Sequence, residues 1–115
     1  MLILPIKKKW FDMIRSGEKK EEYREIKPYY ETRFRNAKLL DDFGGYYGDI
    51  ILRNGYSYKS PAIIARVYLR KGQGRPEWGA EPGKEYFILD IKYVNDYIFV
   101  KSYAEAFFRG RGGKG

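Results

Sequence analysis

The chain contains neither cysteine nor histidine. Without cysteine, disulfide bonds, thiolate zinc sites and cysteine nucleophiles are excluded. Without histidine, the usual general base and the commonest metal ligand are missing. The chain also has no glycine-rich phosphate loop of known spacing, no paired carboxylate motif for a metal and no serine nucleophile elbow. We therefore predict no metal ion and no cofactor, and any chemistry must come from Lys, Glu, Asp, Tyr, Ser or Thr.

Long apolar runs are also missing. The apolar start at residues 1–6 is too short for a signal peptide or a membrane span, and the lysines at 7–9 follow it rather than precede it. We therefore expect an intracellular, cytoplasmic protein with no membrane partner.

The 115 residues, 43% of them hydrophobic, are typical of one globular domain with a modest core. We predict that this domain spans residues 1–109. The glycine-rich basic segment 110–115 then forms a flexible tail. Nothing in the pattern indicates the oligomeric state.

Positive charge is unevenly distributed. The net charge is +8; residues 1–40 hold 11 basic and 6 acidic side chains, whereas residues 41–100 hold 8 of each. A basic excess gathered near the ends of the chain suits a polyanion such as RNA. The same excess is also typical of a solvated surface that only keeps a protein soluble.

Hydrophobic periodicity and turn residues predict the secondary structure. The first half should contain a strand at 2–6, a helix at 7–16 ended by Gly17, an extended strand at 19–25, a second short helix that opens at Pro28, and a loop at 41–48. The second half should contain strands at 49–53, 61–70, 85–93 and 97–101, and a brief helix at 103–109 after the capping box Ser102-x-x-Glu105.

Alternation in two of these strands places hydrophobic residues on one face. In the first, Ile63, Ala65, Val67 and Leu69 should share a face. We predict an α+β fold in which five to six mostly antiparallel strands curl into a small barrel with two to three short helices. Its predicted core includes Trp10, Ile14, Val67, Phe87, Leu89 and Ile91.

The most informative segment is the charged stretch at residues 16–24. Glu22 and Arg24 alternate along the predicted strand and so share a face, about 6.6 Å apart. Lys19 joins them only if the turn after Gly17 rotates it round. Three converging charged side chains would form a polar binding site or an acid–base site. The alternative is a surface salt-bridge ladder, which would contribute little stability.

Two other segments are candidates for binding. The long loop at 71–84 carries Trp78, which either stacks on a base, with Arg75 and Lys71 taking phosphates, or plugs one end of the barrel. Lys7 and its two neighbours lie at a predicted helix N-terminus, where the backbone attracts anions; alternatively they point into water. Tyrosines among basic residues, such as Tyr23, are typical of base-stacking surfaces and equally of core edges.

The chain resembles the ASCH domain family, a branch of the PUA-like RNA-binding superfamily. The resemblance rests on the opening strand Leu2-Ile3-Leu4-Pro5-Ile6-Lys7, on the motif Gly17-x-Lys19-x-x-Glu22-x-Arg24 after a helix, and on a closing strand within Glu81-Pro82-Gly83-Lys84-Glu85-Tyr86-Phe87-Ile88-Leu89-Asp90-Ile91. It implies a PUA-like β-barrel, a cleft lined by the motif, and RNA binding or processing. Some small members of the family are amidohydrolases on an acylated cytidine, and others are ribonucleases. In the amidohydrolases a threonine nucleophile stands three residues after the motif lysine, where this chain has Glu22.

We therefore predict a protein that recognises RNA or a single, modified nucleotide. The predicted ligand-binding residues are Lys7, Lys19, Glu22, Tyr23, Arg24, Arg53, Arg75 and Trp78. One alternative is a small hydrolase of ribonuclease or amidohydrolase type, with Lys19 or Glu22 as general base helped by Tyr23 or Glu77. A second alternative is a non-catalytic protein-interaction domain.

Overall fold

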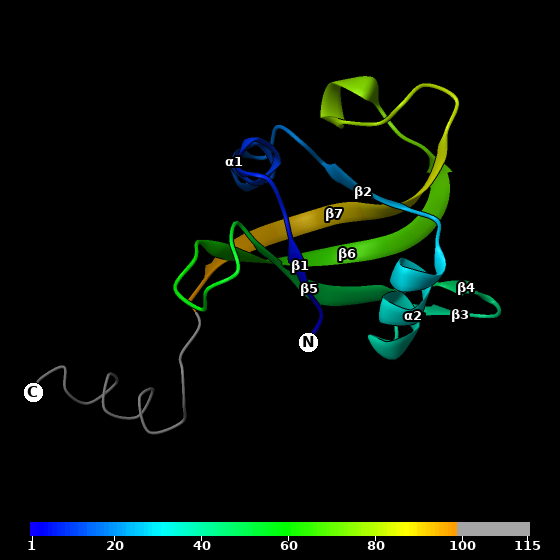
Figure 1. Cartoon of the computed structure of the whole chain (residues 1–115), viewed down its shortest axis with the longest axis horizontal. Coiled ribbons are helices and arrows are strands. Elements are labelled where there is room, and N and C mark those ends of the chain that lie inside the picture. The colour runs from blue at the N-terminus through cyan, green and yellow to red at the C-terminus, as the bar shows by residue number, and fades with distance from the viewer. Residues whose placement is uncertain (99–115) are drawn as a thin grey trace, which may run out of the picture.

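Five strands form one strongly curled sheet in the computed structural model, which describes residues 1–98. Their order across the sheet is β1 (Ile3–Pro5), β5 (Tyr47–Arg53), β6 (Ala62–Gln73), β7 (Glu85–Tyr97) and β2 (Glu21–Glu25) (Figure 1). Strand β1 runs parallel to β5, and every other neighbouring pair is antiparallel. The predicted α+β class with mostly antiparallel strands is confirmed.

The sheet is a half-barrel, because its two edge strands, β1 and β2, do not pair with each other. A side chain bridges this open seam: Arg24 Nη2 on β2 donates a 2.8 Å hydrogen bond to the carbonyl oxygen of Pro5 on β1. The curl of the sheet therefore brings the charged segment of β2 next to the opening strand β1.

Two helices pack on this sheet, near its opposite ends in Figure 1. Helix α1 (Lys8–Ser16) buries Phe11 and Ile14, and ends at Gly17, whose φ of 88° is the left-handed conformation that glycine adopts readily. Helix α2 (Pro28–Asn36) begins at Pro28, as predicted, and buries Phe34.

A small hairpin, β3 (Leu40–Asp41) and β4 (Gly44–Gly45), lies beside α2 where the sequence predicted only a loop at 41–48. The Asp41 carboxylate accepts hydrogen bonds from the backbone N–H groups of Phe43 and Gly44 and from the Tyr46 hydroxyl. These local bonds fold four residues into a turn, a geometry that hydrophobic periodicity does not report.

The core lies inside the curl. The predicted inward face of β6 is confirmed, since Ile63, Ala65, Val67 and Leu69 are all at most 1% exposed. The other predicted core residues Ile14, Phe87 and Leu89 are also buried, whereas Trp10 and Ile91 are half-buried at the core margin.

The predicted break between strands at 85–93 and 97–101 is wrong, because β7 continues without interruption to Tyr97. A bulge shifts its register: Arg66 is opposite Tyr93 but Val67 is opposite Ile91, which leaves Lys92 unpaired. Tyr93 therefore turns to the outer face and is exposed instead of following Ile91 inward. The rest of the predicted strand at 97–101, the predicted helix at 103–109 and the tail at 110–115 lie outside the described residues.

The loop after β6 covers part of the other face of β7. It contains the 3₁₀ turn η1 (Pro76–Trp78), and its Ala80 packs with Tyr86 and Ile88 of β7 and with Tyr23 of β2. Strand β7 is thus buried on both faces beside the charged segment of β2, and the loop stands next to that segment.

Candidate functional site

The three motif side chains converge: Glu22 and Arg24 share a face as their spacing predicted, and the turn after Gly17 brings Lys19 to them. Lys19 Nζ lies 3.3 Å from Glu22 Oε1, and Glu22 Oε2 accepts hydrogen bonds from Arg24 Nε at 3.0 Å and Nη2 at 2.7 Å. Lys19 is 1%, Glu22 6% and Arg24 9% exposed. The alternative of a surface ladder is therefore wrong, since this ion triad is buried.

The local chain path explains how Lys19 reaches the other two residues. After Gly17 ends the helix, the backbone N–H of Lys19 donates to the carbonyl oxygen of Met13, which turns the chain back beneath α1. Glu22 and Arg24 then alternate along β2 opposite Leu89 and Phe87, on the inward face of the sheet. The turn supplies the rotation that strand spacing alone does not give.

The ammonium group of Lys19 is fully engaged. Besides Glu22, it donates to the carbonyl oxygens of Glu21 at 2.6 Å and Trp78 at 2.7 Å, so its three N–H groups have three acceptors. Burial lowers the pKa of Lys19, and the Glu22 carboxylate acts against that shift. Lys19 thus anchors the loop that carries Trp78.

Arg24 connects the triad to the seam and to α2. Its guanidinium donates to Glu22, to the Pro5 carbonyl and, at 3.3 Å, to the Tyr30 hydroxyl. Burial acts to lower the pKa of Arg24, but the charge of Glu22 and the contact with Tyr30 outweigh it and leave that pKa above its usual value. The triad thus sets two basic side chains against one carboxylate.

A cavity of about 290 Å³ lies over the triad, at the open seam between β1 and β2. Aromatic side chains make up much of its wall. The lining residues are Pro5, Ile6, Lys7, Trp10, Glu22, Tyr23, Arg24, Glu25, Tyr30, Trp78, Gly79 and Tyr86. We call this cavity, which has Glu22 and Arg24 on its floor and Lys19 buried beside Glu22, the seam cleft.

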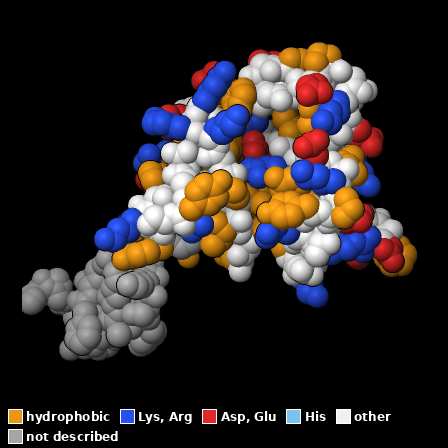
Figure 2. All heavy atoms as spheres, viewed as in Figure 1, with side chains coloured by type: hydrophobic (Ala, Val, Ile, Leu, Met, Phe, Trp, Pro, Cys, Tyr) orange, Lys and Arg blue, Asp and Glu red, His pale blue; other side chains and the backbone are white. Residues whose placement is uncertain are grey.

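Each aromatic residue of the seam cleft has a cation over its ring. The distances from cation to ring centre are 4.6 Å for Lys9 and Trp10, 4.7 Å for Lys19 and Tyr23, 5.6 Å for Lys27 and Tyr30, 5.0 Å for Arg75 and Trp78, and 5.3 Å for Lys84 and Tyr86. Because cations are attracted to the faces of aromatic rings, positive charge and aromatic surface lie next to each other around the cleft. Figure 2 shows basic side chains lying among hydrophobic patches over one face of the molecule.

The predicted site residues divide into two groups. Lys7, Glu22, Tyr23, Arg24 and Trp78 line the seam cleft, and Lys19 and Arg75 contact those residues. Arg53 does not line the cleft: it ends β5 opposite Pro5, and its Nε donates to the carbonyl of Gly55. Lys71 does not line it either and contributes to a different cavity.

Sequence reasoning missed two aromatic residues of the cleft, Trp10, which was assigned to the core, and Tyr30. Tyr86, by contrast, belongs with Tyr23 to the tyrosines among basic residues that are typical of base-stacking surfaces. Of the two missed residues, only Tyr30 could have been placed near the motif from the sequence, because Pro28 starts its helix within one turn of the motif arginine.

Tyr23 is held as a neutral phenol. Its hydroxyl donates to Glu21 Oε1 at 2.7 Å and accepts from the backbone N–H of Arg75 at 2.9 Å. Burial raises the pKa of Tyr23 well above its ordinary value, and the neighbouring Glu21 carboxylate adds to the shift. Tyr23 positions the loop and does not serve as a base at neutral pH.

Within residues 1–98 no group of three or more acidic side chains is placed to hold a metal ion. None of the helices described there is long and apolar enough to cross a membrane. Comparisons of the chain with protein-family models, with curated proteins and with solved structures found no match.

Proposed function

We propose that the seam cleft binds RNA or a single nucleotide, with one base inside the cleft. The observation that carries the proposal is a carboxylate, Glu22, fixed between two buried cations at the floor of an aromatic-walled cavity. Unpaired bases are recognised by stacking on aromatic side chains and by hydrogen bonds to their edges. Cations outside such a cavity hold the phosphates.

The floor of the cleft offers one acceptor and one donor. Glu22 Oε1 has a single 3.3 Å contact, with Lys19, and a carboxylate oxygen accepts two hydrogen bonds. The Tyr30 hydroxyl accepts from Arg24 but donates to no protein acceptor among the described residues. A base edge with an amino group beside an acceptor nitrogen matches this pair.

The size and charge of the cleft agree with this ligand. A volume of about 290 Å³ accommodates one base rather than a folded duplex. Lys7 lines the cleft, and Lys9, Lys27, Arg75 and Lys84 lie over its aromatic rings, while Glu25 of the lining pairs with Lys27 and Lys84.

The same proposal includes membership of the ASCH family within the PUA-like superfamily. Its support is the Gly17-x-Lys19-x-x-Glu22-x-Arg24 motif in a curled sheet: Glu22 and Arg24 line the cleft, and the buried Lys19 contacts Glu22. Location in the cytoplasm also remains a prediction.

The geometry gives less support to a hydrolase. Lys19 has no free N–H, Tyr23 is held neutral, and Glu77 is exposed and 3.5 Å from Arg75 outside the cleft lining. Of the bases that the sequence suggested, Glu22 remains, and both its oxygens already contact cations.

Fluorescence anisotropy with a labelled single-stranded oligoribonucleotide at two salt concentrations tests the proposal. Affinity should fall as salt rises, with a logarithmic slope of about −0.7 for each phosphate neutralised. Lys7→Gln should weaken binding and reduce the slope by about one phosphate, whereas Lys92→Gln, an exposed cation outside the cleft, should not. Absence of binding at low salt would contradict the proposal.

A further inference from the structure

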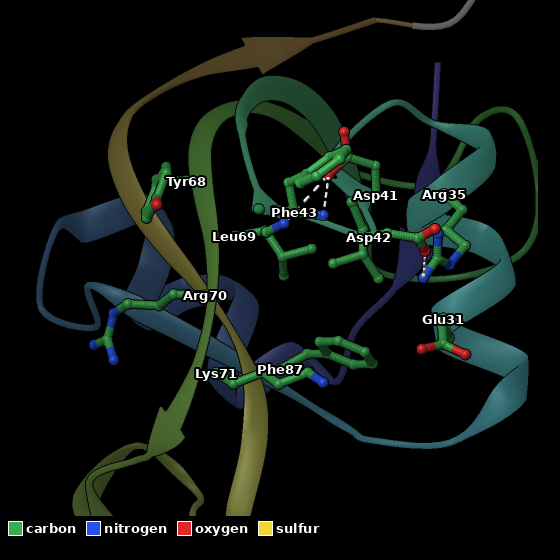
Figure 3. Close-up of a pocket in the computed structure, with 13 residues that line it drawn as sticks. Glu31, Arg35, Asp41, Asp42, Phe43, Tyr68, Leu69, Arg70, Lys71 and Phe87 are labelled. Carbon is green, nitrogen blue, oxygen red and sulfur yellow. Dashed lines mark hydrogen bonds and ion pairs between the residues drawn. The ribbon is translucent and has the colours of Figure 1, made fainter.

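A second cavity, of about 510 Å³, lies between α2, the hairpin β3–β4 and strand β6 (Figure 3). Leu69 and Phe87 give it an apolar floor, and Leu40 and Phe43 belong to the hairpin side. Phe43 is 94% exposed at the hairpin tip. We call this space the hairpin cavity; it shares no lining residue with the seam cleft.

The charged residues of the hairpin cavity balance to zero. The acidic residues are Glu31, Asp41 and Asp42, and the basic residues are Arg35, Arg70 and Lys71. A polyanion would meet as many carboxylates as cations among these lining residues. The lining therefore offers no net positive charge to a phosphate-rich ligand.

Four of these six charges are already used within the protein. Arg35 Nη2 contacts Asp42 Oδ1 at 2.9 Å, and the Asp41 carboxylate is occupied by the hairpin turn. Arg70 extends away from the cavity in Figure 3 and contacts Asp90 and Glu21 on the other face of the sheet.

The remaining two charges are opposite in sign. Among the described residues neither Glu31 nor Lys71 has an ion-pair partner, and the ammonium of Lys71 lies 5.5 Å from the centre of the Phe87 ring. Figure 3 shows Glu31 from α2 and Lys71 from β6 reaching toward the same space beside that ring.

We propose that the hairpin cavity binds a small zwitterion, namely an α-amino acid with an apolar side chain. Its carboxylate would contact Lys71 and its ammonium would contact Glu31, so that both unpaired charges gain a partner. Its side chain would lie on Phe87 and Leu40, and would cover part of Phe43. The inference is independent of nucleic-acid binding at the seam cleft.

Titration calorimetry with three related probes tests the charge requirement. Phenylalanine carries both charges, phenylalaninamide lacks the carboxylate, and N-acetylphenylalanine lacks the ammonium. Phenylalanine should bind in the millimolar range, and each analogue should bind at least about tenfold more weakly. Equal binding of all three probes, or no binding of phenylalanine at tens of millimolar, would overturn the proposal.

Variants locate the site. Lys71→Met and Glu31→Gln should each weaken phenylalanine binding by at least about tenfold, while Arg33→Met, an exposed cation of α2 that does not line the cavity, should leave it unchanged. The exchanged pair Glu31→Lys with Lys71→Glu should restore binding, because the zwitterion can reverse its orientation. Thermal melts confirm that each variant folds. If the folded single variants bind as the parent does, the assignment of the two charges is wrong.

Discussion

The ammonium of Lys19 donates a 2.7 Å hydrogen bond to the carbonyl oxygen of Trp78, 59 residues later in the chain. Two further bonds attach the same loop, from the backbone N–H of Arg75 to the Tyr23 hydroxyl and from that of Glu81 to the Tyr86 hydroxyl. One wall of the seam cleft is therefore positioned by a charged residue that is buried behind its lining. Changes at Lys19 should affect the loop as well as the triad.

Replacement of Lys19 by Met should reduce the free energy of unfolding by about 3–5 kcal/mol, because it leaves Glu22 without one counter-charge and two carbonyls without a donor. Urea denaturation measures the loss. The exposed neighbour Lys20 provides the control, and Lys20→Met should stay within about 0.5 kcal/mol of the parent. A similarly small loss for Lys19→Met would show that the buried contacts are not required.

Replacement of Arg24 by Lys should destabilise the protein nearly as much as replacement by Ala. A lysine keeps the charge but cannot contact Glu22, Tyr30 and Pro5 at once, as the guanidinium does. Calorimetric melting of both variants checks this. In both variants, amide hydrogen exchange in β1 should accelerate relative to the parent more than exchange in β6 does. The reason is that the Arg24–Pro5 bridge across the seam is lost.

Replacement of Glu22 by Gln should separate affinity from selectivity in RNA binding. The two cations keep their attraction for phosphate once their counter-charge is gone, so overall affinity should persist or rise. Discrimination between bases should fall, because the amide offers one acceptor oxygen in place of two. Anisotropy titrations with homopolymeric oligonucleotides measure both quantities; unchanged discrimination would exclude Glu22 from base recognition.

Tyr23 should make stability fall at alkaline pH. Since its pKa is raised in the folded state, the unfolded chain releases this proton first, and the stabilising contribution, complete below about pH 10, is lost as the pH rises toward the folded-state pKa. The lowered pKa of Lys19 acts in the opposite direction, so the measurement is a difference between variants. Between pH 9 and pH 11, the urea midpoint should fall less for Tyr23→Phe than for the parent. Tyr56→Phe, at an exposed position, should show the same fall as the parent.

Replacement of Gly45 by Ala should dislodge the hairpin. A Cβ at this position would overlap the backbone carbonyl of Leu69 on β6, which has no room to move within the sheet. Chemical-shift changes should therefore concentrate at residues 40–46 and at Leu69, with a lower melting temperature. Phe43→Ala, at the exposed hairpin tip, is the control and should leave the melting temperature nearly unchanged.

Alternation and turn residues were sufficient to predict most of the fold. The pattern of β6 gave its inward face, and Gly17 and Pro28 marked helix ends correctly. The bulge at Lys92 was not predictable, because one inserted residue reverses the facing of Tyr93 without changing composition. The hairpin at Asp41 depends on side chain to backbone bonds that periodicity does not register.

The charged residues of the seam cleft were predictable, whereas its aromatic walls were predictable only in part, through Tyr23 and Trp78. Glu22 and Arg24 follow from strand alternation, and Lys19 joins them through the turn after Gly17. Trp10, Tyr30 and Tyr86 come from three separate elements that meet only because the sheet curls back on itself. Contacts of that kind depend on tertiary packing rather than on spacing along the chain.

The open seam also bears on how readily the sheet could pair with another chain. An unclosed sheet exposes two edges, and exposed edges are templates for pairing with another chain. Strand β1 has only three residues and ends in Pro5, while β2 reads Glu-Glu-Tyr-Arg-Glu, so one edge is short and the other is densely charged. Arg24 further occupies the Pro5 carbonyl that an incoming strand would need. The residues that form the floor of the seam cleft thus also protect the sheet against edge-to-edge aggregation.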